Sequence, residues 1–194
     1  MPVIDGTHHI DHSARSQHHT ALAPPFSDVA AHKDALLARY TTLGPVTVEQ
    51  MLGPWRGGVW NSGGVFAALL GSVGWYGKVF RSAGDVDALV FQHSAAPLGV
   101  LVRLLCAPWR LPEDRSLSRH PFGAARLQTR ELYGVQSVAM CYRHLPIADH
   151  FRRIDDRRVM GLMQIARRRE PELFFWLERA DSATALRERT DWYR

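Results

Sequence analysis

The residue best suited to binding chemistry is Lys78, one of only two lysines in the chain, the other being Lys33. It lies in the run Trp75–Phe80, which is typical of a strand. Because successive side chains of a strand point to opposite faces, Tyr76, Lys78 and Phe80 are expected to share one face. A cation between two aromatic rings would suit the acidic head group of an apolar ligand. The alternative is a lysine at a sheet edge whose amine reaches solvent.

A second group of candidates surrounds His150. An imidazole oriented by a carboxylate can act as a general base, and Asp149 and Asp155 are close in sequence. On a strand both carboxylates fall on the face opposite His150, so a structural or ligand-contacting histidine is favoured over a catalytic one. Arg152 shares the face of His150, and this pair would suit a carboxylate or a phosphate. The alternative is a salt-bridged outer face that includes the charged residues 155–158.

If these strands line a cavity, Met140, Tyr142 and Met163 are candidates for its walls, because thioethers adapt to irregular ligands. Plain core packing is the alternative for the methionines. The sequence contains no Gly-x-x-x-x-Gly-Lys phosphate loop, no Gly-x-Ser-x-Gly elbow and no His-Glu-x-x-His zinc motif. We therefore predict no catalytic residue and no metal site from motifs.

The composition is that of a globular chain, with 46% hydrophobic and 22% charged residues among 194. The formal charge of +5 is compatible with nucleic acid, an anionic membrane surface or an acidic ligand. No nucleic-acid-binding module is recognisable, so nucleic acid is not an expected partner. Cys106 and Cys141 show neither a disulfide framework nor metal-site spacing. We find no signal peptide and no apolar run long enough to span a bilayer, and we expect a cytoplasmic protein.

The chain divides into a tail, a domain and a second tail. Residues 1–25 are polar and turn-rich and are expected to be disordered; their five histidines (His8, His9, His12, His18 and His19) lack preformed metal-binding geometry. A single domain is expected over 26–181. It begins with a helix from about Ser27 to Tyr40, then a short helix with a capping box at Thr47. Residues 182–194 are expected to be a helix-prone tail.

Short segments between turn residues follow, as in an antiparallel barrel or sandwich. The expected strands are 55–60, 75–80, 86–91, 124–131, 135–142, 147–154, 159–166 and 173–177. Residues 65–73 favour a helical turn, and the long connection 92–118 is expected to be a partly helical lid. Several strands are apolar on both faces, which predicts a covered outer wall. The cover is the N-terminal helices, the middle segment or a second subunit, and we predict a homodimer.

The segment Leu52–Gly58 places Trp55 between Gly53 and Gly57, each two residues away. Together with 75–80, 145–155 and 161–163, this segment resembles the bacterial GXWXG-motif family, whose second half is a domain of unknown function. The resemblance runs from about Val46 to Arg179. Its first half covers about 46–105 and its second about 120–180.

The resemblance implies a calycin-like β-barrel. Trp55 looks like the tryptophan of lipocalin-type barrels, which closes the barrel floor under an arginine from near the chain end, and Arg179 is the candidate here. The chain departs from the family pattern at Arg143 and Gln164, where the family usually has acidic residues. These two differences put acid-dependent chemistry in doubt.

The sequence therefore predicts a mainly β fold: a single antiparallel calycin-like barrel with N-terminal helices and a partly helical insertion. The hypothesis for function is a non-enzymatic protein that binds a small amphipathic or acidic ligand, such as a lipid, a fatty-acyl or a phospholipid-like molecule, without a cofactor. Lys78, His150 and Arg152 would hold the head group, and Phe80, Met140, Tyr142 and Met163 would line the tail.

Two alternatives for function stay open. One is a haem site of the nitrobindin kind, in which His150 or His144 would be the axial ligand. The other is an enzyme of unknown reaction with His150 as its general base.

Overall fold

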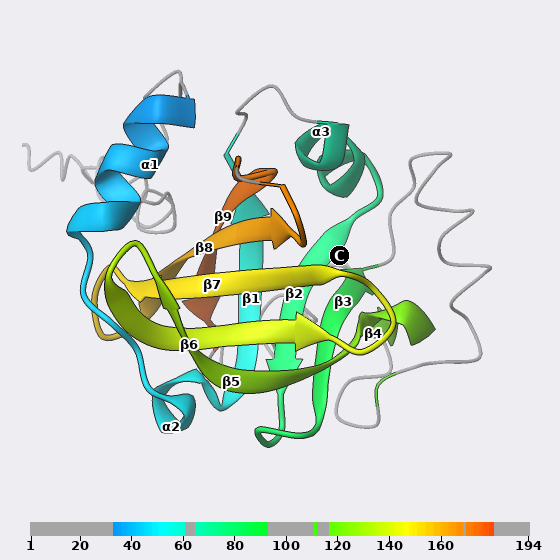
Figure 1. Cartoon of the computed structure of the whole chain (residues 1–194). Coiled ribbons are helices and arrows are strands. Elements are labelled where there is room, and N and C mark those ends of the chain that lie inside the picture. The colour runs from blue at the N-terminus through cyan, green and yellow to red at the C-terminus, as the bar shows by residue number, and fades with distance from the viewer. Residues whose placement is uncertain (1–32, 61–64, 93–110, 112–116, 169, 181–194) are drawn as a thin grey trace, which may run out of the picture.

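The chain folds into a closed antiparallel β-barrel (Figure 1). The computed structural model describes residues 33–60, 65–92, 111, 117–168 and 170–180. Eight strands form the ring in the order β1-β9-β8-β7-β6-β5-β3-β2, which closes because β2 also pairs with β3. The strands are β1 Gly53–Val59, β2 Trp75–Phe80, β3 Val86–Gln92, β4 Leu117–Arg119, β5 Ala124–Leu132, β6 Val135–Tyr142, β7 Ile147–Arg153, β8 Arg158–Ile165 and β9 Leu173–Arg179. The short β4 extends the sheet beyond β3, and the predicted mainly β barrel is confirmed.

The helices occupy the outside and the ends of the barrel. They are α1 Lys33–Thr42, α2 Val48–Met51 and α3 Val65–Ser72, with a 3₁₀ turn, η1, at Pro121–Gly123. The predicted capping box is present at α2, where Thr47 N donates to Gln50 Oε1 at 2.9 Å and Gln50 N donates to Thr47 Oγ1 at 3.3 Å. The two predicted tails and most of the predicted lid lie outside the described residues.

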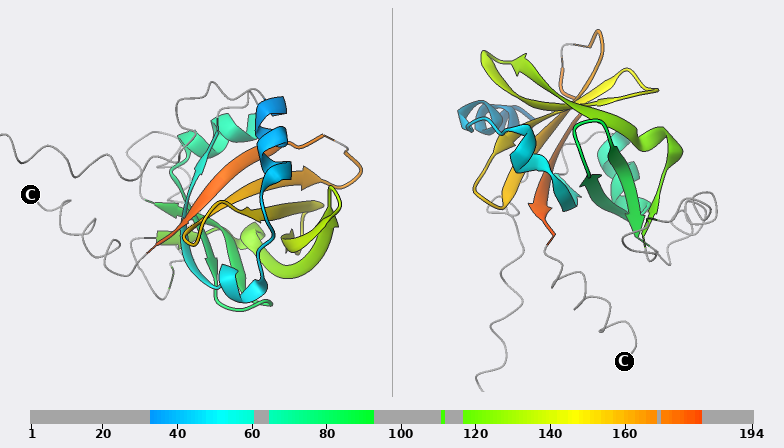
Figure 2. Two further views of the ribbon diagram at one scale, coloured as in Figure 1. Left: turned by 90° about the vertical axis from the view of Figure 1, so that its left-hand side faces the viewer. Right: turned by 90° about the horizontal axis from the view of Figure 1, so that it is seen from below.

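Strands β8 and β9, which are apolar on both faces, are covered on the outside of the barrel by α1 (Figure 2). Leu36, Tyr40 and Leu43 form one buried cluster with outward-facing side chains of β8 and β9, among them Met160 and Phe174. This contact accounts for the covered outer wall within one chain. The homodimer stays a prediction, and a mass from light scattering would test it.

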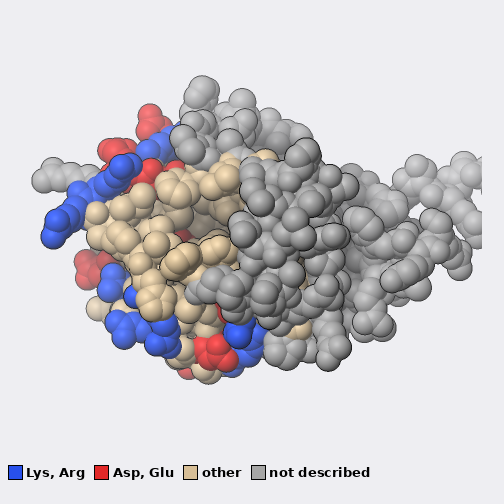
Figure 3. Space-filling model, turned by 90° about the vertical axis from the view of Figure 1, so that its right-hand side faces the viewer, with Lys and Arg blue, Asp and Glu red and all other residues tan. Residues whose placement is uncertain are grey.

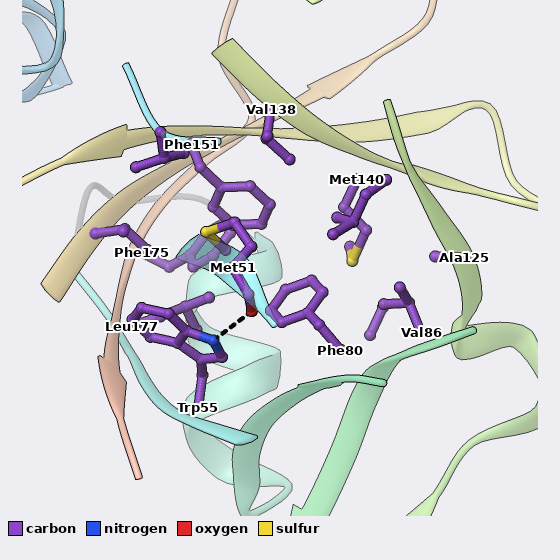
Figure 4. Packing of buried hydrophobic residues seen from close by; sticks show 14 of the residues in the cluster. Met51, Trp55, Phe80, Val86, Ala125, Val138, Met140, Phe151, Phe175 and Leu177 are labelled. Atoms are coloured by element: carbon purple, nitrogen blue, oxygen red, sulfur yellow. Dashed lines mark hydrogen bonds between the residues drawn. The ribbon is translucent and has the colours of Figure 1, made fainter. Parts of the chain in front are cut away.

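The interior of the barrel is packed with aromatic and methionine side chains (Figure 4). The rings of Phe80 and Phe151 meet edge to face with centroids 5.9 Å apart, and Phe151 meets Phe175 at 6.0 Å. Phe80 belongs to β2 and Phe151 to β7, which stand four places apart in either direction around the ring. Side chains from these two strands therefore meet across the barrel.

A β-bulge in β2 changes which side chains face the interior. The pairing with β3 shifts on both sides of Gly77, whose φ of +151° is one that L side chains rarely adopt. Trp75 and Lys78 consequently both face inward, and Tyr76 packs outside with Val79. The prediction that Tyr76 shares the face of Lys78 and Phe80 is wrong, because strict alternation does not hold across a bulge.

Gly77→Ala is expected to destabilise the protein by about 1–3 kcal/mol, through an unfavourable φ and a backbone clash. A Cβ at residue 77 would lie 2.1 Å from the carbonyl oxygen of Trp55, which belongs to the backbone of the paired strand β1. Gly84→Ala is the matched control, because nothing lies within 4 Å of a Cβ there. Urea unfolding of both variants checks the prediction. Equal stabilities would show that the bulge does not require glycine.

Candidate functional site

A buried ion pair spans the barrel. Lys78 Nζ on β2 lies 2.8 Å from Asp149 Oδ2 on β7, and the two side chains are only 3% and 2% exposed. Lys78 Nζ also donates to the carbonyl oxygen of Ala88 at 3.2 Å. Charged groups are almost never buried unless they are paired. The ion pair therefore fixes the position of two charged groups inside an otherwise apolar core.

Aromatic rings surround the ammonium group. The distances from Lys78 Nζ to the ring centroids are 5.0 Å for Phe175, 5.3 Å for Trp75 and 5.9 Å for Tyr142. All three lie within the range of a cation–π attraction, which is stronger when the cation is desolvated. Phe175 and Trp75 also meet edge to face with centroids 5.9 Å apart. The lysine is thus held by three rings as well as by the carboxylate.

Two buried polar atoms at this site have no hydrogen-bond partner among the described residues. They are the acceptor Asp149 Oδ1 and the donor Trp75 Nε1. Most buried polar atoms in folded proteins are paired, so this acceptor and this donor each leave hydrogen-bonding capacity for a further polar group. Asp149 Oδ1 requires a donor, and Trp75 Nε1 requires an acceptor.

Burial controls the protonation of the site. Desolvation raises the pKa of Asp149, and the charge and hydrogen bond of Lys78 oppose the rise. Burial and the nearby Asp149 raise the pKa of Tyr142 well above its ordinary value, so its phenol stays protonated. The positive charge of Lys78 is matched by Asp149 at 2.8 Å. The site therefore does not present the free cation that the sequence predicted for an acidic head group.

The structure does not bring His150 and Arg152 to Lys78. These side chains alternate with Asp149 and Phe151 along β7 and face outward. Arg152 donates to the carbonyl oxygens of Leu132 and Val135, at 2.6 and 3.4 Å, and its guanidinium lies 5.2 Å from the Tyr40 ring of α1. The predicted head-group site of Lys78, His150 and Arg152 is wrong, because β7 separates the lysine from the other two residues.

His150 is a buried, neutral histidine of the outer face. Burial, then the charges of Arg130 and Arg152, lower its pKa to about 4. His144 is exposed in the turn after β6. Neither histidine offers its ring to the barrel interior, as the haem and general-base alternatives would require. The described residues also contain no group of three or more His, Cys, Asp or Glu side chains that could hold a metal ion.

The pKa of His150 predicts a loss of stability in acid. A histidine whose pKa is lowered in the folded state binds its proton more readily when unfolded, so stability falls as the pH drops from about 6.5 to about 4. His150→Gln is expected to remove about 3 kcal/mol of that loss, since the pKa falls from 6.5 to about 4 and one pH unit of differential protonation is worth about 1.4 kcal/mol. Urea unfolding at the two ends of this pH range checks it. An unchanged acid loss in the variant would assign it to other groups.

The tryptophan motif builds the floor of the barrel. Trp55 is 2% exposed, its Nε1 donates to the Met51 carbonyl oxygen at 2.7 Å, and the guanidinium carbon of Arg179 lies 4.5 Å from its ring centroid. Gly53 has a φ of +113°. A Cβ on Gly57 would lie 2.5 Å from the Trp75 ring, so this glycine lets the Trp75 indole lie against β1. The motif therefore supports both the floor and one wall of the polar site.

The remaining predicted residues divide between the interior and a surface groove. Phe80, Met140 and Met163 lie in the interior cluster, and Tyr142 packs against it from the end of β6. Tyr142 and Ile147 also line a groove of about 280 Å³. Its other lining residues are Arg126, Arg130, Cys141, Leu145, Pro146, Ala148, Gln164 and Ala166. Figure 3 looks onto the end of the molecule with the β6–β7 turn, where blue basic side chains gather beside uncharged surface.

Sequence reasoning missed Asp149 and Trp75 as members of this site. Strand alternation correctly predicts that Asp149 faces away from His150, but it does not identify Lys78 as the partner of Asp149. The missed signal is a repeated spacing: Lys78 precedes Phe80 by two residues, and Asp149 precedes Phe151 by two. Because both phenylalanines are core residues, the lysine and the aspartate had to face the same interior. Trp75 was hidden by the bulge at Gly77.

Comparisons with known proteins agree with the motif resemblance. Residues 38–95 match the family described as GXWXG protein, and residues 123–179 match a domain of unknown function, DUF4334. The chain is similar to a crystal structure of a protein from Thermomonospora curvata, with 33% identity and a TM-score of 0.62 over 78% of this chain and 89% of the other. No curated protein matches the sequence. Among the described residues, no helix is long and apolar enough to cross a membrane.

Proposed function

The chain belongs to the GXWXG family, in which the second half is the DUF4334 domain, and from that premise we propose that it binds a small amphipathic ligand inside its barrel. The ligand has an apolar body and a polar head group, as in a lipid or fatty-acyl molecule. The observation that carries the proposal is that Asp149 Oδ1 and Trp75 Nε1, on two side chains that both lie near Lys78 Nζ, are buried without a hydrogen-bond partner among the described residues.

The segments that carry the family resemblance support this placement. Trp55 comes from the first, Lys78 from the second and Asp149 from the third, and all three side chains are buried in the barrel. A ligand site is typically apolar with a few placed polar groups, and this interior offers one ion pair among rings and thioethers.

The charge of the site defines the head group. Lys78 and Asp149 together are neutral, so a free anion gains little net attraction and meets an uncovered carboxylate oxygen. A group that both donates and accepts, such as an alcohol, an amide or a protonated carboxylic acid, matches the acceptor of Asp149 and the donor of Trp75 that are left without partners. We therefore narrow the expected ligand from acidic to neutral and hydrogen-bonding.

The groove of about 280 Å³ supports a route to this site. Tyr142 lines the groove, and its ring centroid lies 5.9 Å from Lys78 Nζ. Ile147 likewise belongs to the groove and packs against the interior cluster. A ligand that displaces these two side chains passes from the surface to the ion pair.

Calorimetric titration with decan-1-ol, and with decane as the analogue without a head group, tests the proposal. We expect the alcohol to bind and Asp149→Asn to weaken it about 10-fold or more, since a hydrogen bond to a charged group is worth about 1.5–3 kcal/mol. Native mass spectrometry of freshly purified protein tests for a natural ligand of the same kind.

His150→Gln is the matched control, because its side chain lies on the same strand but faces outward. It should leave alcohol binding unchanged. Equal affinities for alcohol and decane, or equal affinities of wild type and Asp149→Asn, would refute the assigned head-group site. Absence of any binding would show that the two unpaired atoms hold only water.

A further inference from the structure

We propose that Asp149 accepts a proton from the bound ligand, so that the protein catalyses a proton transfer in which a carbon-bound proton next to an electron-withdrawing group is removed and returned. The inference rests on the proposed function, because it requires a ligand at the same site. It replaces the predicted base, His150, with a carboxylate that faces the interior.

The geometry divides the two carboxylate oxygens between two roles. Lys78 holds Oδ2 at 2.8 Å, and Lys78 is itself held by the Ala88 carbonyl oxygen at 3.2 Å. Oδ1 is buried and has no partner among the described residues. A base must reach its proton directly or through one water, and only Oδ1 is free to do so. Lys78 therefore acts as a positioning residue that orients the carboxylate.

The surroundings favour proton transfer. Asp149 is only 1% exposed, and a desolvated carboxylate is a stronger base than one in solution, which agrees with the raised pKa of Asp149. The Trp75 ring centroid lies 5.3 Å from Lys78 Nζ, and the Nε1–H of this ring has no hydrogen-bond partner among the described residues. Such a donor stabilises the negative charge that forms on the ligand when its proton leaves.

The step balances as a reversible proton transfer. The C–H bond of the ligand breaks and an O–H bond forms at Asp149 Oδ1, while the electron pair moves onto the neighbouring carbonyl-type oxygen as an enolate. Asp149 then returns a proton to the carbon, and the enolate becomes the carbonyl compound again. No oxidant, reductant or second substrate is consumed.

A probe reaction with the same first step tests the proposal. In 5-nitrobenzisoxazole a base removes the C3 proton, the C–H electrons form the nitrile, and the N–O bond breaks to release a coloured phenolate. We expect wild type to accelerate this reaction at least about 10²-fold over the same concentration of acetate, as general bases do. Asp149→Asn should reduce the rate to the acetate level, and deuterium at C3 should slow the wild-type reaction.

The pH profile provides a measurement that needs no variant. The rate should rise with pH and level off once Asp149 is ionised, with a midpoint above the usual aspartate range because burial raises its pKa. Asp85→Asn is the control carboxylate, since Asp85 lies in an exposed turn. Its rate should equal that of wild type.

The isostere 5-nitroindazole separates this inference from the proposed function. It carries an N–H donor and a nitrogen acceptor but cannot undergo the elimination, so its calorimetric titration reports binding alone. Binding together with an Asp149-dependent rate supports both proposals. Binding without such a rate overturns the proton transfer and leaves ligand binding in place. Absence of binding overturns both.

Discussion

Trp55→Ala is expected to lower the free energy of unfolding by about 3–5 kcal/mol, because it deletes a large buried aromatic side chain. The indole is 2% exposed and packs among Met51, Phe80 and Leu177 (Figure 4). The substitution also removes the hydrogen bond to the Met51 carbonyl oxygen and the ring beneath Arg179. Urea unfolding should show a lower midpoint with an unchanged slope.

Two further variants isolate the role of this indole. Trp176→Ala removes the same side chain from the outward face of β9, where it is only partly buried, and should cost less. Trp55→Phe keeps the ring under Arg179 but loses the Nε1 donor, and should fall between wild type and Trp55→Ala. If Trp55→Ala and Trp176→Ala lower the free energy of unfolding equally, Trp55 contributes no more to stability than a tryptophan on the outer face.

The strands could be predicted because their signals are local. The expected segments 75–80 and 135–142 coincide with β2 and β6, and the other expected barrel strands agree with the structure within two residues at each end. Alternating apolar residues and turn residues decide these boundaries without reference to the rest of the chain. The motif residues Trp55 and Arg179 were predictable for a different reason, since the resemblance assigned them a shared role.

The composition of the polar site could not be predicted because it depends on how the ring closes. Asp149 and Lys78 are separated by 71 residues in sequence and come from opposite strands. Alternation shows that Asp149 and His150 face opposite ways, but it does not show which of them faces inward. The bulge at Gly77 then brings Trp75 into the interior in place of Tyr76, and an alternating pattern does not reveal a bulge.

The closed ring also explains why the candidate site is neutral. A sequence reading of Lys78 alone predicts a cation available to a ligand. In the barrel, the lysine meets a carboxylate from the opposite wall, and the buried atoms of this site without any hydrogen-bond partner among the described residues are Asp149 Oδ1 and Trp75 Nε1. The expected ligand therefore changes from an acidic molecule to a neutral, hydrogen-bonding one because Asp149 pairs with Lys78.

Lys78→Met is expected to destabilise the protein by about 3–5 kcal/mol at neutral pH, because it leaves Asp149 as an unpaired buried carboxylate. The loss should shrink in acid. Burial already raises the pKa of Asp149 and Lys78 opposes the rise, so without the lysine the folded state binds the proton of Asp149 still more tightly. A group that holds its proton more tightly when folded costs stability as the pH rises, and the penalty disappears below the ordinary aspartate pKa. Urea unfolding at about pH 4 and about pH 8 measures this difference.

The double variant Lys78→Met, Asp149→Leu separates the charge effect from the loss of packing. Replacing both partners of a buried ion pair by apolar side chains is often neutral or stabilising, so the double variant should regain most of the stability that Lys78→Met loses. Such a protein should fold and yet fail to bind decan-1-ol, because Asp149 Oδ1 is gone. That combination would mean that the ion pair serves the ligand site rather than the fold. If Lys78→Met loses the same stability at both pH values, or if the second substitution restores nothing, the cost comes from altered packing and the charge argument fails.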